Sequence, residues 1–195
     1  MFEYVTEFES QLAEFFGSPY AVATDSCTHA LELCLRHTHE DYITIPKRTY
    51  VSVPMTCMKL KLEWSWREEE WSDYYYLGDT NIIDAAVLWG ENTYITETFM
   101  CLSFQFKKHL NLGRGGAILL QNKEDYDTLK KMSYDGRDLS RPWAEQDITT
   151  IGYHYYMTPE VAKTGIELLN ERKKTPGKKW SHRDYPDLTQ MSVFK

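Results

Sequence analysis

Residues 103–116, SFQFKKHLNLGRGG, join an apolar strand pattern to two adjacent lysines and a glycine-rich turn. A Walker A loop requires Lys followed by Ser or Thr after its last glycine, but Ala117 and Ile118 stand there. A dinucleotide-binding loop opens a helix, whereas GRGGAILLQ opens a second strand pattern. The chemistry that remains is that of a desolvated lysine, whose amine loses its proton more easily and can form an imine with an aldehyde.

Two other segments carry groups that suit such an aldehyde. Asp84 ends the apolar run NIIDAA, where an unpaired carboxylate would be costly and where a pyridinium nitrogen would be a suitable partner. Ser26, Cys27 and Thr28 lie where a predicted strand passes into the amino terminus of a helix. Free backbone N–H groups make that position favourable for a phosphate.

Tyr50 follows the second predicted strand, where its ring could stack on a flat cofactor. Together the residues predict pyridoxal phosphate, with its aldehyde on Lys108, its ring nitrogen at Asp84 and its phosphate at the helix start. A lysine before glycines is by itself usually a solvated loop residue. The prediction therefore depends on the combination of groups.

Composition narrows the class of protein. The 195 residues, 42% of them hydrophobic, suit one soluble domain, and the net charge of −7 argues against nucleic-acid binding. No apolar run approaches the roughly 20 residues that span a membrane, and no signal-peptide pattern opens the chain. The four cysteines form no Cys-x-x-Cys pair, so we expect neither a zinc site nor disulfides, and a cytoplasmic location.

Strand and helix patterns alternate along the chain. Helices are predicted over 2–16, 28–38, 49–60, 123–136 and 158–174, and strands over 20–26, 43–46, 60–68, 81–86, 98–105 and 116–121. This order predicts a three-layer α/β/α fold with a mostly parallel central sheet. Residues 1–172 would form the cofactor-binding domain, and 173–195 an irregular tail or an arm across a partner.

Five ordered segments resemble those of the DegT/DnrJ-type sugar aminotransferases, pyridoxal-phosphate enzymes of the aspartate aminotransferase superfamily (fold type I). They are FESQLAEFFGSPYAVATDSCTHALELCL, IPKRTYVSV, IIDAA, SFQFKKHLNLGRGG and GYHYYM. Together they cover most of residues 7–172. The resemblance implies the large domain of these enzymes, with the carboxy-terminal small domain largely absent.

The resemblance also assigns individual residues. It identifies Lys108, rather than Lys107, as the imine lysine, and it makes Ser103 a phosphate ligand. His154 takes the place of an asparagine in a segment that, in the family, reaches toward a neighbouring subunit's site, so we predict that it binds cofactor. Other departures are Cys27 for a glycine, Val87 for Gln or His, Arg114 for glutamate and Tyr156 for arginine.

The resemblance implies transfer of an amino group from an amino acid such as glutamate to a keto sugar, with a nucleotide-linked sugar favoured. It also implies a homodimer and a role in polysaccharide or antibiotic-sugar synthesis. The alternative is a catalytically inactive pyridoxal-phosphate-binding domain that acts as a partner or scaffold. A purely structural α/β module would leave Lys108 and Asp84 unexplained.

Overall fold

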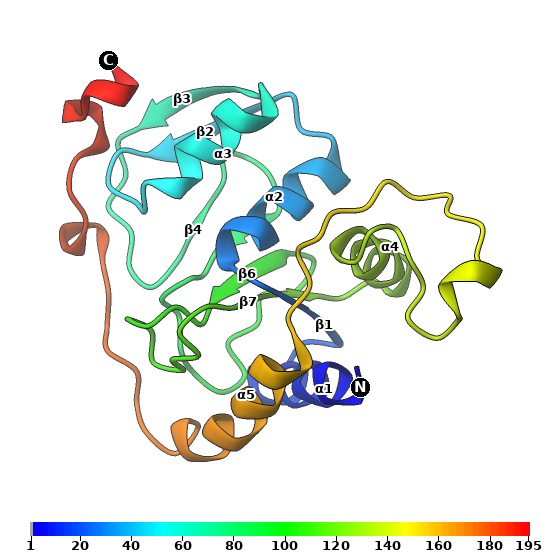
Figure 1. The fold of residues 1–195 in the computed structure, drawn as a ribbon. Coiled ribbons are helices and arrows are strands. Elements are labelled where there is room, and N and C mark those ends of the chain that lie inside the picture. Colours follow the sequence, from blue (N-terminus) through cyan, green and yellow to red (C-terminus); the bar gives the residue numbers. More distant parts are fainter. Residues whose placement is uncertain (1) are drawn as a thin grey trace.

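The computed structural model describes residues 2–195, and Figure 1 shows helices on both faces of a central sheet. The helices are α1 (Glu3–Phe16), α2 (Cys27–Thr38), α3 (Ser52–Leu60), α4 (Lys123–Ser133) and α5 (Pro159–Arg172). The strands are β1 (Tyr20–Thr24), β2 (Tyr42–Pro46), β3 (Glu63–Arg67), β4 (Tyr75–Tyr76), β5 (Ile82–Asp84), β6 (Phe99–Ser103) and β7 (Gly116–Leu120). Each of these helices falls within a range predicted from sequence, give or take one residue, and β4 was not predicted.

The central sheet has the strand order β1-β7-β6-β5-β4. The predicted strand direction is wrong for this central sheet, which is mostly antiparallel. Only the pair β5–β6 is parallel, while β1–β7, β6–β7 and β4–β5 are antiparallel. The chain between β6 and β7 contains no helix and turns back through Gly113 and Gly115, both at positive φ. Without a crossover helix, consecutive strands pair antiparallel.

Alternating side chains of the sheet enter two separate cores, which gives the predicted three layers. Ala21, Met100 and Leu119 pack with α1 and α5 on one face. Val22 and Ile118 pack with α2 and α4 on the other. The α/β/α fold class is therefore confirmed, since the strands are buried on both faces as the apolar runs indicated.

The two remaining strands form a small parallel sheet of their own, β2–β3, connected through α3. The alternating pattern predicted in this region is present: Trp64 and Trp66 are half-buried while Glu63 and Ser65 are exposed. Both tryptophan rings meet Phe194, at centroid distances of 6.3 and 5.5 Å. The last residues of the chain thus cover this sheet.

The segment 173–195 runs from the end of α5 across the surface of the domain to β3. Figure 1 shows it (orange to red) on one side of the molecule. It contains the short 3-10 helices η2 (His182–Asp184), η3 (Leu188–Gln190) and η4 (Ser192–Phe194). Backbone hydrogen bonds join Asp73 N–H to the Trp180 carbonyl (2.9 Å) and Leu188 N–H to the Lys47 carbonyl (2.9 Å). Contacts with the domain therefore hold this segment along its length.

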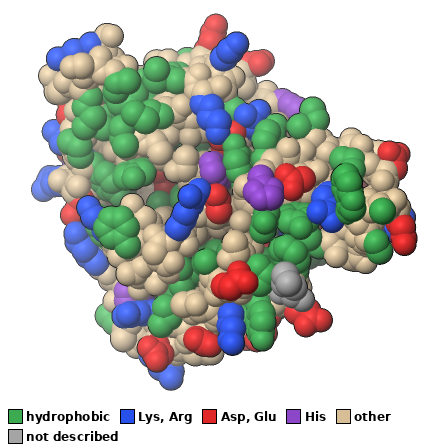
Figure 2. All heavy atoms as spheres, viewed as in Figure 1, with side chains coloured by type: hydrophobic (Ala, Val, Ile, Leu, Met, Phe, Trp, Pro, Cys, Tyr) green, Lys and Arg blue, Asp and Glu red, His purple; other side chains and the backbone are tan. Residues whose placement is uncertain are grey.

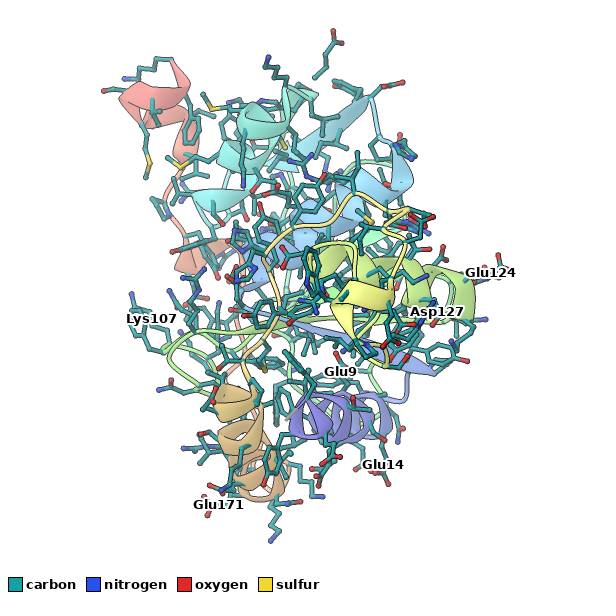
Figure 3. The ribbon with its side chains drawn as sticks, turned by 45° about the vertical axis from the view of Figure 1, so that its right-hand side comes forward. Glu9, Glu14, Lys107, Glu124, Asp127 and Glu171 are labelled. Carbon is teal, nitrogen blue, oxygen red and sulfur yellow. The ribbon has the colours of Figure 1, made fainter. Side chains whose placement is uncertain are left out.

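Glu9 of α1 is a buried carboxylate that depends on one cation. It accepts hydrogen bonds from Lys130 of α4 and from the backbone N–H of Ala23, and its side chain is almost wholly enclosed. Burial raises the pKa of Glu9, and the Lys130 ammonium group acts against that rise. In Figure 3, Glu9 lies inside the molecule, whereas Glu14 and Glu124 lie at its surface.

Replacing Lys130 by alanine should therefore lower the free energy of unfolding by about 3–5 kcal/mol, because it leaves a buried carboxylate without its partner. The matched control is Lys123→Ala, which breaks an ion pair with Asp127 on the same helix between side chains 57% and 51% exposed. We expect that control to cost less than about 1 kcal/mol. Urea denaturation measures both, and equal losses would contradict the assignment.

Among residues 2–195 no helix is both long and apolar enough to cross a bilayer. The same residues contain no cluster of three or more His, Cys, Asp or Glu side chains that could hold a metal ion.

Candidate active site

One cavity, of about 160 Å³, lies at the carboxyl ends of β5 and β6 and the amino terminus of α2. It brings together all the site residues predicted from sequence except His154. The predicted residues that line it are Ser26, Cys27, Thr28, Tyr50, Asp84, Ser103 and Lys108. Leu31 and Val53 supply an apolar wall. Parallel strands such as β5 and β6 end at the same edge of a sheet, which explains why residues distant in sequence meet here.

The amino terminus of α2 presents backbone N–H groups to the cavity, an arrangement that suits an anion. Ser26 is the N-cap, and its hydroxyl accepts a hydrogen bond from the His29 N–H at 3.2 Å. Cys27 and Thr28 are the first helical residues, so their N–H groups have no acceptor within the helix. Gly116 allows β7 to pack closely against the start of α2, because a side-chain carbon at this position would lie 2.4 Å from the backbone of Cys27.

Cys27 takes the place of a glycine without backbone strain. It begins α2 and is not among the residues with positive φ, so the helical conformation suits a side chain. Its thiol is buried and donates to the carbonyl of Cys101 at 3.6 Å. The substitution therefore leaves the anion-binding turn intact.

Asp84 is buried and fully engaged on both oxygens. Oδ2 accepts a hydrogen bond from the Tyr75 hydroxyl at 2.6 Å, and Oδ1 accepts one from the Ala86 N–H at 3.0 Å. Burial raises the pKa of Asp84, while the Tyr75 hydrogen bond, the Ala86 N–H and the charge of Lys108 lower it. A carboxylate oxygen can accept more than one hydrogen bond, so a ring N–H could still be accommodated.

Tyr75 positions Asp84 and was missed by the sequence argument. Its hydroxyl also contacts Thr49, and burial raises its pKa well above the ordinary value, so it remains a donor near neutral pH. The signal in the sequence was the YYY run at 74–76, in which Tyr75 belongs to one core while Tyr74 and Tyr76 pack on the other. Tyr75 lies directly opposite Asp84 in the β4–β5 pair, so the two side chains share one face of the sheet, which the run of identical residues did not reveal.

Tyr75→Phe should shift the acidic limb of the pH–rate profile to higher pH. The hydrogen bond from Tyr75 lowers the pKa of Asp84, so its loss lets that pKa rise further, and the carboxylate becomes anionic only at higher pH. We expect turnover on the acidic limb to fall by up to about tenfold, as a rise of one pKa unit would give, while turnover on the alkaline side of that limb changes little. An unshifted limb would show that Tyr75 does not act through Asp84. Tyr74→Phe is the control.

Lys108 is the amine of the cavity. Burial lowers its pKa below that of an ordinary lysine, with Asp84 opposing the shift. The Nζ atom lies 5.5 Å from the centroid of the Trp180 ring, which comes from the carboxy-terminal segment. Lys107 by contrast is exposed and does not line this cavity. The environments of the two adjacent lysines therefore differ.

Arg114 stands where the family carries glutamate, and the structure supplies a compensating charge. Its Nη2 atom lies 2.6 Å from Oδ2 of Asp25, and its Nε donates to the Asp25 carbonyl at 3.2 Å. Asp25 also contacts the His29 ring. The inverted charge is therefore paired at the mouth of the cavity, beside the anion-binding turn.

The structure does not place His154 in the Lys108 cavity of its own chain. Its side chain is 72% exposed and lies 3.0 Å from Oδ2 of Asp135. It lines a separate shallow hollow with Tyr156, and Arg114 lies between the two sites because it lines both. His154 therefore lies outside the Lys108 cavity of its own chain, and its role in cofactor binding stays a prediction that would require contact with a second chain.

Four further cavity residues were not predicted: Ser52, Ala86, Gln105 and Gly115. Ser52 shares a hydrogen bond of 2.8 Å with the Thr28 hydroxyl, which orients that side chain at the helix start. It lies two residues after Tyr50, on the first turn of α3. Its distance from Thr28 in sequence gave no indication of this contact.

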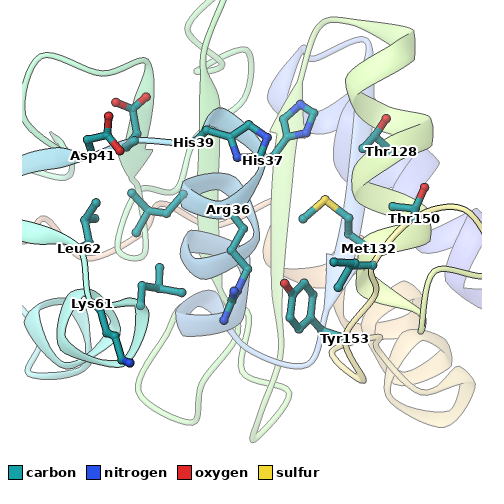
Figure 4. A pocket seen from close by; sticks show the side chains of 14 residues that line it. Arg36, His37, His39, Asp41, Lys61, Leu62, Thr128, Met132, Thr150 and Tyr153 are labelled. Atoms are coloured by element: carbon teal, nitrogen blue, oxygen red, sulfur yellow. The ribbon is translucent and has the colours of Figure 1, made fainter.

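A larger hollow lies elsewhere, between α2, α4 and the end of α3 (Figure 4). Two of its charged residues already have partners: His37 lies 2.7 Å from Asp125, and Arg36 lies 2.9 Å from Glu32. None of the predicted site residues lines it. Its size therefore does not make it the better candidate.

The fold is that of solved sugar-aminotransferase structures. AtS13 from Actinomadura melliaura superposes with a TM-score of 0.74 at 19% identity, covering 88% of this chain and 60% of that chain. The sugar aminotransferase CalS13 from Micromonospora echinospora gives 0.74 at 14% identity (88% and 61%). DesI, solved with its TDP-sugar product, gives 0.69 at 16% identity (88% and 53%). Comparison with curated proteins gives no significant sequence match.

The sequence profile of the DegT/DnrJ/EryC1/StrS aminotransferase family matches residues 1–63 and 88–181. The chain therefore belongs to this family, as its motifs predicted. It spans about three fifths of the length of the solved structures that it resembles.

Proposed function

We propose that this chain is a pyridoxal-phosphate-dependent aminotransferase. The observation that carries the proposal is the convergence of Lys108, Asp84 and the α2 amino terminus on one cavity. An amine with a lowered pKa, a buried carboxylate and free N–H groups suit the aldehyde, the ring nitrogen and the phosphate of this cofactor. Spr1654 from Streptococcus pneumoniae, a neighbour at 18% identity, was solved in PLP and PMP forms.

The residues divide the work as follows. Bound pyridoxal phosphate supplies an electron sink for the transfer of nitrogen. Lys108 would hold the aldehyde and, once released, would move the proton at the substrate carbon. Asp84 would hold a proton on the ring nitrogen, and Tyr75 keeps Asp84 in place. Ser26, Thr28 and Ser103 would bind the phosphate. Tyr50, which is 48% exposed at the cavity, would cover the ring.

The favoured acceptor is a nucleotide-linked keto sugar, with an amino acid such as glutamate as donor. Two facts support this class: the family match, and the TDP-sugar product named for DesI. The predicted cytoplasmic location is compatible with four free cysteines, of which Cys34 and Cys101 have sulfur atoms 3.7 Å apart and unbridged.

Spectroscopy separates this proposal from its alternative, a domain that binds the cofactor without turnover. Adding pyridoxal phosphate to the purified chain should give the visible absorption of lysine-bound cofactor. Adding glutamate should then convert it to the absorption of the aminated cofactor. A band that forms but that no amino acid bleaches would establish the inert binder, and no band at all would refute both.

We also propose a homodimer. Figure 2 shows hydrophobic side chains gathered on the face over α3, where Tyr50, Met55 and Met58 are 42–48% exposed. Tyr50 belongs to this patch and to the cavity, so a second chain that covers the patch would also border the site. Sedimentation measures the state, and Met55→Glu with Met58→Glu should yield monomers.

A further inference from the structure

A second hollow adjoins the Lys108 cavity. Its volume is about 320 Å³, and it shares Ala86, Ser103 and Lys108 with the first cavity. Lys108 therefore lies between two cavities: the first suits the cofactor, and the second has no ligand assigned to it by the proposed function. A molecule held in the second hollow would contact Lys108, which is part of its lining.

The lining of this hollow is cationic. Besides Lys108 it contains Lys107, Arg172 and Lys178, together with His109, and no aspartate or glutamate. The remaining lining is mostly apolar or aromatic, with Trp89 and Trp180. On a chain of net charge −7, several cationic side chains without a carboxylate among them indicate an anionic ligand.

The carboxy-terminal segment builds one wall of the hollow. Trp180 is fixed to Asp73 by two backbone contacts, its carbonyl accepting at 2.9 Å and its N–H donating to Oδ1 at 3.2 Å. The Lys178 ammonium lies 3.8 Å from the centre of the Trp180 ring and 2.9 Å from Oδ1 of Asp184. Asp184 thus holds Lys178 from outside the hollow, since it does not line it.

The base of the segment is fixed as well. Nε2 of His109 lies 3.2 Å from the Arg172 carbonyl and 3.1 Å from the Thr175 hydroxyl. Gly177 approaches Trp89 so closely that a side-chain carbon would meet it at 2.7 Å. The cationic side chains of the segment are therefore placed at this hollow by specific contacts and not by a loose tail.

We propose that this hollow is the subsite for the anionic group of a substrate, and that the segment 173–195 supplies it through Lys178 and Trp180. The ligand class is a phosphate- or carboxylate-bearing substrate whose reacting carbon lies at Lys108. The choice of ligand class rests on the proposed aminotransferase function. The binding of an anion to the hollow can nevertheless be measured without any turnover. Two sources share this chemistry: the diphosphate of a nucleotide sugar and the second carboxylate of a dicarboxylic substrate.

Calorimetry of the full chain, saturated with pyridoxal phosphate so that the cofactor's own phosphate site is filled, tests the subsite. The probes are thymidine diphosphate and 2-oxoglutarate. Lys178→Ala and Arg172→Ala should each weaken binding of one probe about tenfold, since each removes a charged partner. Lys163→Ala, an exposed lysine on α5 outside the hollow, is the charge-matched control and should leave binding unchanged.

The outcomes are decisive. Weaker thymidine diphosphate binding in both variants assigns the subsite to the nucleotide, and weaker 2-oxoglutarate binding assigns it to the dicarboxylate. Variants that bind both probes like wild type overturn the inference, as does a wild-type chain that binds neither. Arg172→Ala keeps the test valid if Lys178→Ala loosens the segment, because Arg172 belongs to α5. The cofactor's visible band reports the proposed function separately: anion binding that depends on Lys178 without that band would refute the function and keep the subsite.

Discussion

Replacing Lys108 by alanine should abolish the visible absorption of lysine-bound cofactor and lower turnover by about 10³-fold or more. Under the proposed mechanism two roles are lost at once, because Lys108 would both hold the aldehyde and move the proton at the substrate carbon, and proton transfer alone is worth about 10²–10⁴-fold. The partly buried position of this amine lowers its pKa, which favours the neutral, nucleophilic form. Absorption spectra and steady-state rates measure the two losses.

The adjacent lysine offers a matched control. Lys107→Ala removes the same charge one residue away, from a side chain that is exposed and does not line the cofactor cavity. We expect the visible band and the rate to survive that change, although Lys107 does line the second hollow and substrate affinity can fall. If Lys107→Ala removed the band and Lys108→Ala kept it, the assignment of the imine lysine would be wrong.

The sequence predicted local structure well because periodicity is a local property. The apolar spacing in 2–16 and the change of pattern at Ser26–Thr28 locate α1 and the start of α2 to within one residue, and in the structure Ser26 caps α2 by accepting a first-turn N–H. The direction of neighbouring strands is not local. The antiparallel direction of β6 and β7 follows from the absence of a helix between them. The glycine-rich turn was a sign of this, but the alternation of helices and strands elsewhere in the chain favoured parallel pairs.

The cavity was predictable to the extent that its residues occupy strand ends and helix starts. Asp84, Ser103 and Ser26 satisfy that condition, while Lys108 lies in the turn that follows β6. Tyr75 and Trp180 do not, because each reaches the site through a contact between segments far apart in sequence: Tyr75 through the β4–β5 pair, Trp180 through Asp73. A segment with no periodic pattern gives no sequence signal for where it packs.

Asp84→Asn should reduce turnover by about 10²–10³-fold while leaving the chain at least as stable as wild type. Asparagine keeps the size of the side chain: its single carbonyl oxygen can still accept from the Ala86 N–H, and its NH2 group can donate to the Tyr75 oxygen, but it cannot hold a proton on the ring nitrogen. Losing one electrostatic partner of a reacting group typically has an effect of this size. Rates measured with cofactor still bound to Lys108 isolate the step from cofactor loss.

The expected stability distinguishes a functional carboxylate from a structural one. Burial raises the folded-state pKa of Asp84, so the anionic form is disfavoured by folding, and stability falls as pH rises from the unfolded pKa to the folded one. A neutral asparagine removes that penalty above the folded pKa. Thermal melts at pH 8 should therefore show no loss for Asp84→Asn, nor for the exposed control Asp79→Asn, which should also retain full activity. A large drop in melting temperature together with unchanged turnover would make Asp84 a structural residue and remove the ring-nitrogen partner on which the cofactor assignment depends.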